Sequence, residues 1–148
     1  MTVEEIRIVF VVYVSAILPL ILILVLRNKI PSWIPKFYFI IFSICAFGWE
    51  LWFNFGILNG DSVNLRRSES LNFWLPQNIN WILNSMADAG TISLGGLLLI
   101  KFFSKKGIDP FKSWRWVQFA VLFTWCIGQN LYCLLYTSDA ADETEGVV

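Results

Sequence analysis

The sequence contains no histidine, only three cysteines and few charged side chains. Without histidine, a haem site or a metal centre with imidazole ligands is excluded. Cys45 and Cys126 lie inside apolar stretches with no paired spacing, so they indicate small core residues rather than a disulfide or metal framework. We therefore expect neither a metal nor another cofactor.

The formal net charge is zero, and no basic run extends beyond short clusters, so nucleic-acid binding has no support. Hydrophobic residues make up 57% of the chain and charged residues 15%, and the charges fall in groups that leave long apolar stretches between them. This composition is typical of membrane proteins.

Four apolar stretches are long enough to cross a hydrocarbon core about 30 Å thick, which requires roughly 20 helical residues. They lie at about 6–26, 35–57, 79–103 and 114–136. The sequence therefore predicts an all-α membrane protein, a bundle of four transmembrane helices, in a single domain over residues 1–132.

Basic residues of the short loops predict the orientation, because Lys and Arg are retained on the cytoplasmic side. The first and third predicted loops are the basic ones, with Arg27, Lys29 and Lys36 in the first, and Lys101, Lys105, Lys106, Lys112 and Arg115 in the third. The termini and the second loop, in which Arg66 and Arg67 stand against Asp61 and Glu69, are expected on the non-cytoplasmic side.

The end of the chain has a different character. Cys133–Glu143, with the sequence CLLYTSDAADE, resembles the conceptual translation of a transposon-end adapter used in preparing sequencing libraries. A natural polar tail is the alternative, but the composition changes abruptly inside the fourth predicted span. We expect residues 133–148 to be a non-native tail that replaces the native sequence after Tyr132, and we exclude it from functional reasoning.

Two carboxylates lie inside predicted spans, Glu50 in the second and Asp88 in the third. An ionisable side chain in hydrocarbon costs at least about 2.5–3.5 kcal/mol and usually marks function. Both lie in the outer half of the membrane by their distance from the span centres, and Gln129 of the fourth span lies at a similar level. Two nearby carboxyls in a low dielectric should leave at least one protonated, which makes Glu50 and Asp88 candidate catalytic residues.

Polar residues recur at helical spacing around both acids. Asn80, Asn84 and Thr91 share a face with Asp88, and Ser43 and Asn54 share a face with Glu50. Interhelical packing is the simpler interpretation for Asn80, Asn84 and Ser43. For the acids a structural Glu–Asn bond remains an alternative. The candidate ligand-binding polar residues are Asn54, Asn84, Thr91 and Gln129.

Four tryptophans lie deep in the predicted spans: Trp49, Trp52, Trp81 and Trp125. Core packing is their default role. An aromatic wall beside carboxyls is also suited to a flat apolar ligand or to stabilising a cation.

The second, third and fourth predicted spans each carry a short motif. The second span has an acid followed by an aromatic pair, Glu50–Phe53; the third has Asp88, Thr91 and Gly96; and the fourth has the pair Gly128 and Gln129. Over roughly residues 35–132 this order resembles the EXPERA domain, the four-span unit of emopamil-binding-protein-like sterol isomerases and their non-enzymatic relatives. The chain departs from that family by Asp88 in place of Glu and by the absence of a histidine before Glu50.

The resemblance implies a carboxylate-lined intramembrane cavity that binds a sterol- or lipid-like ligand, with sterol isomerase activity left open. Membrane lipids and a sterol-like small molecule are the implied partners, and a homo-oligomer stays open. One alternative is a proton-coupled carrier or channel subunit, although the two halves of the chain do not resemble inverted repeats. The other is a non-catalytic structural membrane subunit.

Overall fold

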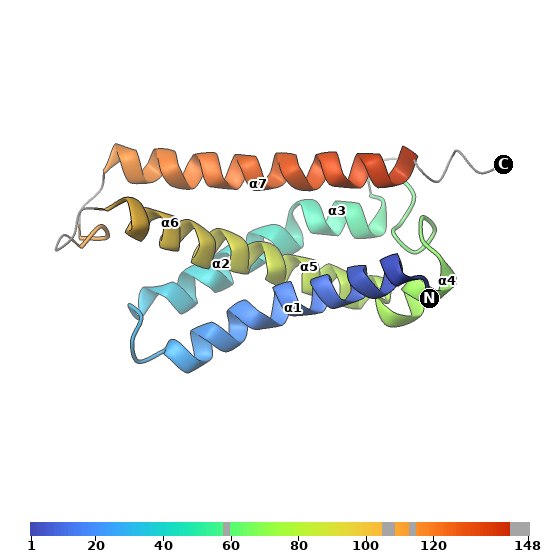
Figure 1. Ribbon diagram of the computed structural model, residues 1–148, viewed down its shortest axis with the longest axis horizontal. Helices are drawn as coiled ribbons and strands as arrows, with labels where there is room; N and C mark the ends of the chain where they lie inside the picture. The colour runs from blue at the N-terminus through green and yellow to red at the C-terminus, as the bar shows by residue number, and fades with distance from the viewer. Residues whose placement is uncertain (58–59, 105–108, 113–114, 143–148) are drawn as a thin grey trace. The chain divides into compact units, whose positions relative to one another are not determined.

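The computed structural model describes residues 1–57, 60–104, 109–112 and 115–142, apart from the side chains of 129–130 and 132–142. Every regular element in these ranges is helical (Figure 1), which confirms the predicted all-α class. The elements are α1 (Val3–Leu26), α2 (Trp33–Phe47), α3 (Trp49–Phe55), α4 (Glu69–Trp74), α5 (Gln77–Gly90), the π-helical segment η1 (Thr91–Gly95), α6 (Gly96–Phe103) and α7 (Trp116–Asp142).

Three helical runs are long and apolar enough to cross a membrane: Val3–Leu26, Trp33–Phe55 and Gln77–Phe103. They overlap the first three predicted spans. In α7 the described apolar part, Trp116–Gly128, is shorter than a span. The fourth span, and with it the bundle of four transmembrane helices, therefore stays a prediction.

The chain divides into two compact units, Met1–Leu94 and Gly95–Val148. In the first unit, α1, α2 and α3 all pack against α5 (Figure 1). In the second unit, α6 packs against α7. The single domain over residues 1–132 and the non-native character of residues 133–148 both stay predictions, and 143–148 lie outside the described residues.

α1 begins at a capping box, in which the Thr2 hydroxyl accepts from the Glu5 amide at 3.2 Å and the Glu5 carboxylate accepts from the Thr2 amide at 2.7 Å. Glu5 also joins the start of α4 to α1. Ser70 donates a hydrogen bond to the Glu5 carboxylate at 2.9 Å, and Ser68 donates to the same oxygen. The Tyr13 hydroxyl donates to the Trp74 carbonyl at 3.1 Å at the other end of α4.

α1 crosses α5 where Pro19 faces Gly90. A Cβ atom at Gly90 would overlap the Pro19 ring, so the absence of a side chain lets the two helices approach. Buried apolar side chains lie on both sides of this crossing: Ala16, Leu71, Leu75 and Leu83 in one cluster, and Ile23, Tyr38 and Ala89 in the other.

The second span is broken at Gly48, which ends α2 and precedes α3 with φ −89° and ψ −122°. A Cβ atom there would lie against the Ile44 carbonyl oxygen. The shared face expected for Ser43 and Glu50 assumed one straight helix. Instead, Ser43 is exposed and donates to the Phe39 carbonyl at 2.9 Å, while Glu50 is buried in the first turn of α3.

In the second unit, two adjacent glycines let the helices approach. A Cβ atom at Gly95 would lie 3.1 Å from the Trp125 ring, and one at Gly96 would overlap the Leu122 side chain. Close packing of α6 on α7 accounts for both glycines.

We predict that Gly90→Ala destabilises the protein by about 1–3 kcal/mol, because the added methyl group overpacks the crossing with Pro19. Gly128→Ala is the matched control, since a Cβ atom there meets nothing within 4 Å and alanine favours the helix. Thermal unfolding in detergent micelles measures both. Equal melting temperatures for the two variants would contradict the tight crossing.

Candidate functional site

Glu50 lies in the first turn of α3 with only 9% of its surface exposed. The Asn54 amide, one turn along the same helix, donates to the carboxyl group at 2.9 Å. The side chain of Asn84 on α5 also hydrogen-bonds this carboxyl group. Two helices therefore supply the donors that hold the buried acid.

Asn54 is the centre of this network and is only 1% exposed. Its amide nitrogen donates to the Glu50 carbonyl at 2.8 Å as well as to the carboxyl group, and its amide oxygen accepts from Asn80 at 2.6 Å. Its backbone carbonyl accepts from the Gln77 side chain at 2.7 Å and from the Val63 amide at 3.1 Å. One residue thus joins α3, α5 and the connection between α3 and α4.

Asp88 approaches the same cluster from α5. Its Oδ2 accepts a hydrogen bond from Trp49 Nε1 at 2.9 Å, and Trp49 directly precedes Glu50 in the chain. The carboxyl groups of Glu50 and Asp88 interact electrostatically. The structure therefore brings together five of the predicted site residues, namely Trp49, Glu50, Asn54, Asn84 and Asp88.

Trp81 has a structural role at the break in the second span. The last carbonyls of a helix lack an intrahelical partner, and Trp81 Nε1 donates to one of them, that of Ala46, at 2.7 Å. Its ring meets Phe47 and Phe55 edge-on, with centroid distances of 6.4 and 5.8 Å. Trp81 thus packs α5 against both halves of the broken span.

The remaining candidates lie elsewhere. Trp52 is half exposed, and the Thr91 hydroxyl at the start of η1 donates to the Ala87 carbonyl at the end of α5 at 2.8 Å. Trp125 belongs to the second unit, where its ring packs against Gly95. The side chain of Gln129 lies outside the described residues. The predicted polar layer that includes Gln129 therefore stays a prediction.

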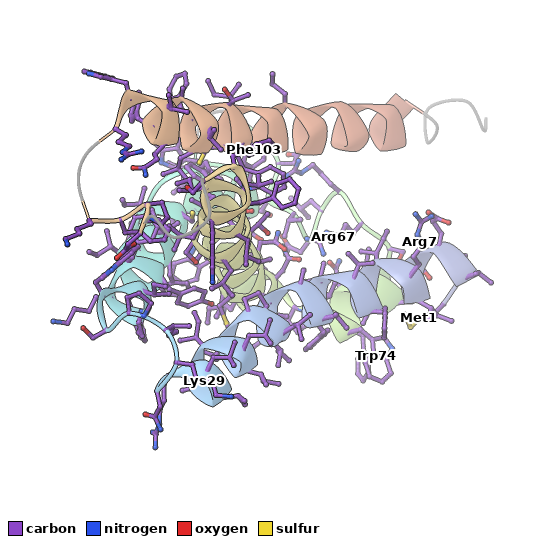
Figure 2. The ribbon with its side chains drawn as sticks, turned by 60° about the vertical axis from the view of Figure 1, so that its left-hand side comes forward. Met1, Arg7, Lys29, Arg67, Trp74 and Phe103 are labelled. Atoms are coloured by element: carbon purple, nitrogen blue, oxygen red, sulfur yellow. The ribbon has the colours of Figure 1, made fainter. Side chains whose placement is uncertain are left out.

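Arg67, which lies on the connection between α3 and α4 (Figure 2), was not predicted as a site residue. It is partly buried and interacts electrostatically with Glu50. Burial lowers the pKa of its guanidinium group, and the neighbouring charge of Arg66 lowers it further. A signal was present in the sequence, because a pair of arginines is unusual in a loop expected on the non-cytoplasmic side.

Comparisons with protein-family models, curated proteins and solved structures give no match to this chain. The resemblance to the EXPERA domain therefore rests on the sequence motifs alone.

We predict that Asn54→Ala lowers the free energy of unfolding by about 2 kcal/mol or more. It removes a donor from Glu50 and the acceptor of Asn80, and each buried group left unsatisfied costs about 1–3 kcal/mol. Asn78→Ala, at an exposed position of α5, is the matched control. If thermal unfolding in micelles does not separate the two variants, Asn54 does not hold α3 to α5.

Proposed function

We propose that this chain is an integral membrane protein in which Glu50 and Asp88 bind the polar end of a sterol- or lipid-like ligand. The observation that supports the proposal is the convergence of two carboxyl groups, from α3 and α5, inside helical runs apolar enough to span a membrane. Inserting an acid into the membrane is unfavourable, so acids that occur there usually line ligand or ion sites.

The packing of α3 on α5 does not require the two acids. The amide pair Asn54 and Asn80 already joins α3 to α5 with a 2.6 Å hydrogen bond, and Gln77 adds another. Uncharged contacts of this kind are sufficient to fasten membrane helices. A titratable pair beside them is better explained by a ligand.

The carboxyl oxygens can accept further hydrogen bonds. An ionised carboxylate offers about four acceptor positions. In the described part of the chain, Glu50 receives side-chain donors from Asn54 and Asn84, and Asp88 receives one from Trp49. A hydroxyl or ammonium group of a ligand would use the remaining positions, with its apolar body among the apolar side chains of the spans.

The more specific form of the proposal is an isomerase that moves a double bond of a sterol-like ring. One carboxyl group in its acid form would protonate the double bond, and the other, as carboxylate, would remove the neighbouring proton, so that protons balance over the cycle. Trp49, which is hydrogen-bonded to Asp88, would stabilise the intermediate cation through its ring. A loss of double-bond migration in Glu50→Gln and Asp88→Asn that exceeds their loss of product binding distinguishes this form from binding alone.

We further propose that the N-terminus and the connection between α3 and α4 lie on the non-cytoplasmic side, because the flanking connections are more basic. Glu50 and Asp88 would then lie toward that side of the membrane. The proposed topology includes a fourth membrane span in α7.

We predict saturable binding of a 3-hydroxy sterol or its 3-amino analogue to the purified protein, weakened at least about tenfold by Glu50→Gln and by Asp88→Asn. The reason is the loss of a charged hydrogen-bond partner. Asn78→Ala should bind as the wild type does. Absence of saturable binding to well-folded wild-type protein would contradict the proposed ligand site and leave a structural or partner-binding role.

We predict that Gly60→Cys, in a background without the native cysteines, reacts with a membrane-impermeant maleimide only from the non-cytoplasmic side. Gly60 is exposed, and a Cβ atom there meets nothing within 4 Å. Lys29→Cys in the turn after α1 should react only from the opposite side. Labelling of both positions from the same side would overturn this topology.

A further inference from the structure

We propose that Arg67 is a second recognition group of the ligand site, and that it selects a ligand whose polar head carries an oxygen acceptor over one that carries only an ammonium group. The inference rests on the proposed function. It adds the chemical class of the head group and a residue outside the predicted site.

The position of Arg67 is fixed on both sides. Arg66 donates to the Phe53 carbonyl at the end of α3 at 2.7 Å. Ser68 donates to Glu5 at the start of α1. The backbone at Arg67 is therefore held between two anchored neighbours on the α3–α4 connection, where Figure 2 labels the residue.

The two arginines differ in their surroundings. Arg66 is exposed, whereas Arg67 is partly buried and acts electrostatically on Glu50. Among the described residues, the charges that act on Glu50 are those of Asp88 and Arg67. Arg67 is therefore the cation that belongs to the carboxyl cluster.

The guanidinium group of Arg67 has donors to offer. It carries five N–H groups in a rigid planar fork. No described residue accepts a hydrogen bond from it, and no carboxylate in the described chain lies within 4 Å of it. The group interacts with Glu50 at a distance without contacting it, which leaves the guanidinium free to bind an acceptor.

Charge and hydrogen bonding favour the same kind of ligand. An oxygen of a hydroxyl or phosphate head can accept from Arg67 while a hydroxyl hydrogen donates to a carboxyl group of the cluster. An ammonium head can satisfy only the carboxyl groups and is repelled by the guanidinium. Arg67 therefore raises the affinity for oxygen-bearing heads relative to amines.

The test uses a 3-hydroxy sterol and its 3-amino analogue as matched probes, with Arg67→Gln as the variant and Arg7→Gln, at an exposed position of α1, as the control. We expect Arg67→Gln to shift the affinity ratio toward the amine by about tenfold or more, since a charged donor is lost and a repulsion is removed. Arg7→Gln should leave the ratio within about twofold. Arg67→Lys keeps the charge and should keep the rejection of the amine while losing part of the affinity for the alcohol.

The outcomes separate the two proposals. If neither probe binds the wild type, the ligand site itself fails, and this inference fails with it. If both probes bind and Arg67→Gln leaves their ratio unchanged, the ligand site stands and the role of Arg67 is overturned. If Arg67→Gln does not fold, Arg67→Lys decides, because equal discrimination and equal alcohol affinity in that variant would contradict recognition by the guanidinium fork.

Discussion

Polar groups inside an apolar span must find their partners within the protein, because the hydrocarbon of a membrane supplies none. In the first unit this requirement centres on the carboxyl group of Glu50. Asn54 hydrogen-bonds this carboxyl group from the same helix, and Asn84 hydrogen-bonds it from α5. The packing of α3 on α5 therefore also keeps this acid hydrogen-bonded.

The break at Gly48 makes that arrangement possible. It interrupts the second span directly before Trp49 and Glu50, so these residues and Asn54 are carried by a new helix packed on α5. The interruption leaves carbonyls without helical partners, and the indole of Trp81 satisfies that of Ala46. Gly48 thus interrupts the apolar helix, and Trp81 stabilises the interruption beside the carboxyl cluster.

The sequence was sufficient to predict the all-helical class and three of the apolar spans, because these depend on the length of apolar runs. The two acids stand out as rare charges within those runs, and their role in a site stays a prediction. Helical spacing also placed Asn84 beside Asp88 and Asn54 beside Glu50, since that rule is local. The break at Gly48 was not predictable, because a single glycine in an apolar run is common in membrane helices. The arginine pair was a visible signal, but its link to Glu50 was missed because the electrostatic interaction of Arg67 with Glu50 depends on how a long connection folds back.

The polar residues of α5 follow one helical face in two groups. Gln77 and Asn80, in the first turns, bind Asn54 and thereby hold the end of α3. Asn84 and Asp88, one and two turns farther along, interact with the acid cluster and with Trp49. Because residues spaced three and four apart stack on one face, the same geometry serves both groups. The amide contacts with Asn54 therefore lie at the start of α5 and the contacts of the carboxyl cluster lie beyond them, so that α5 presents both along a single face.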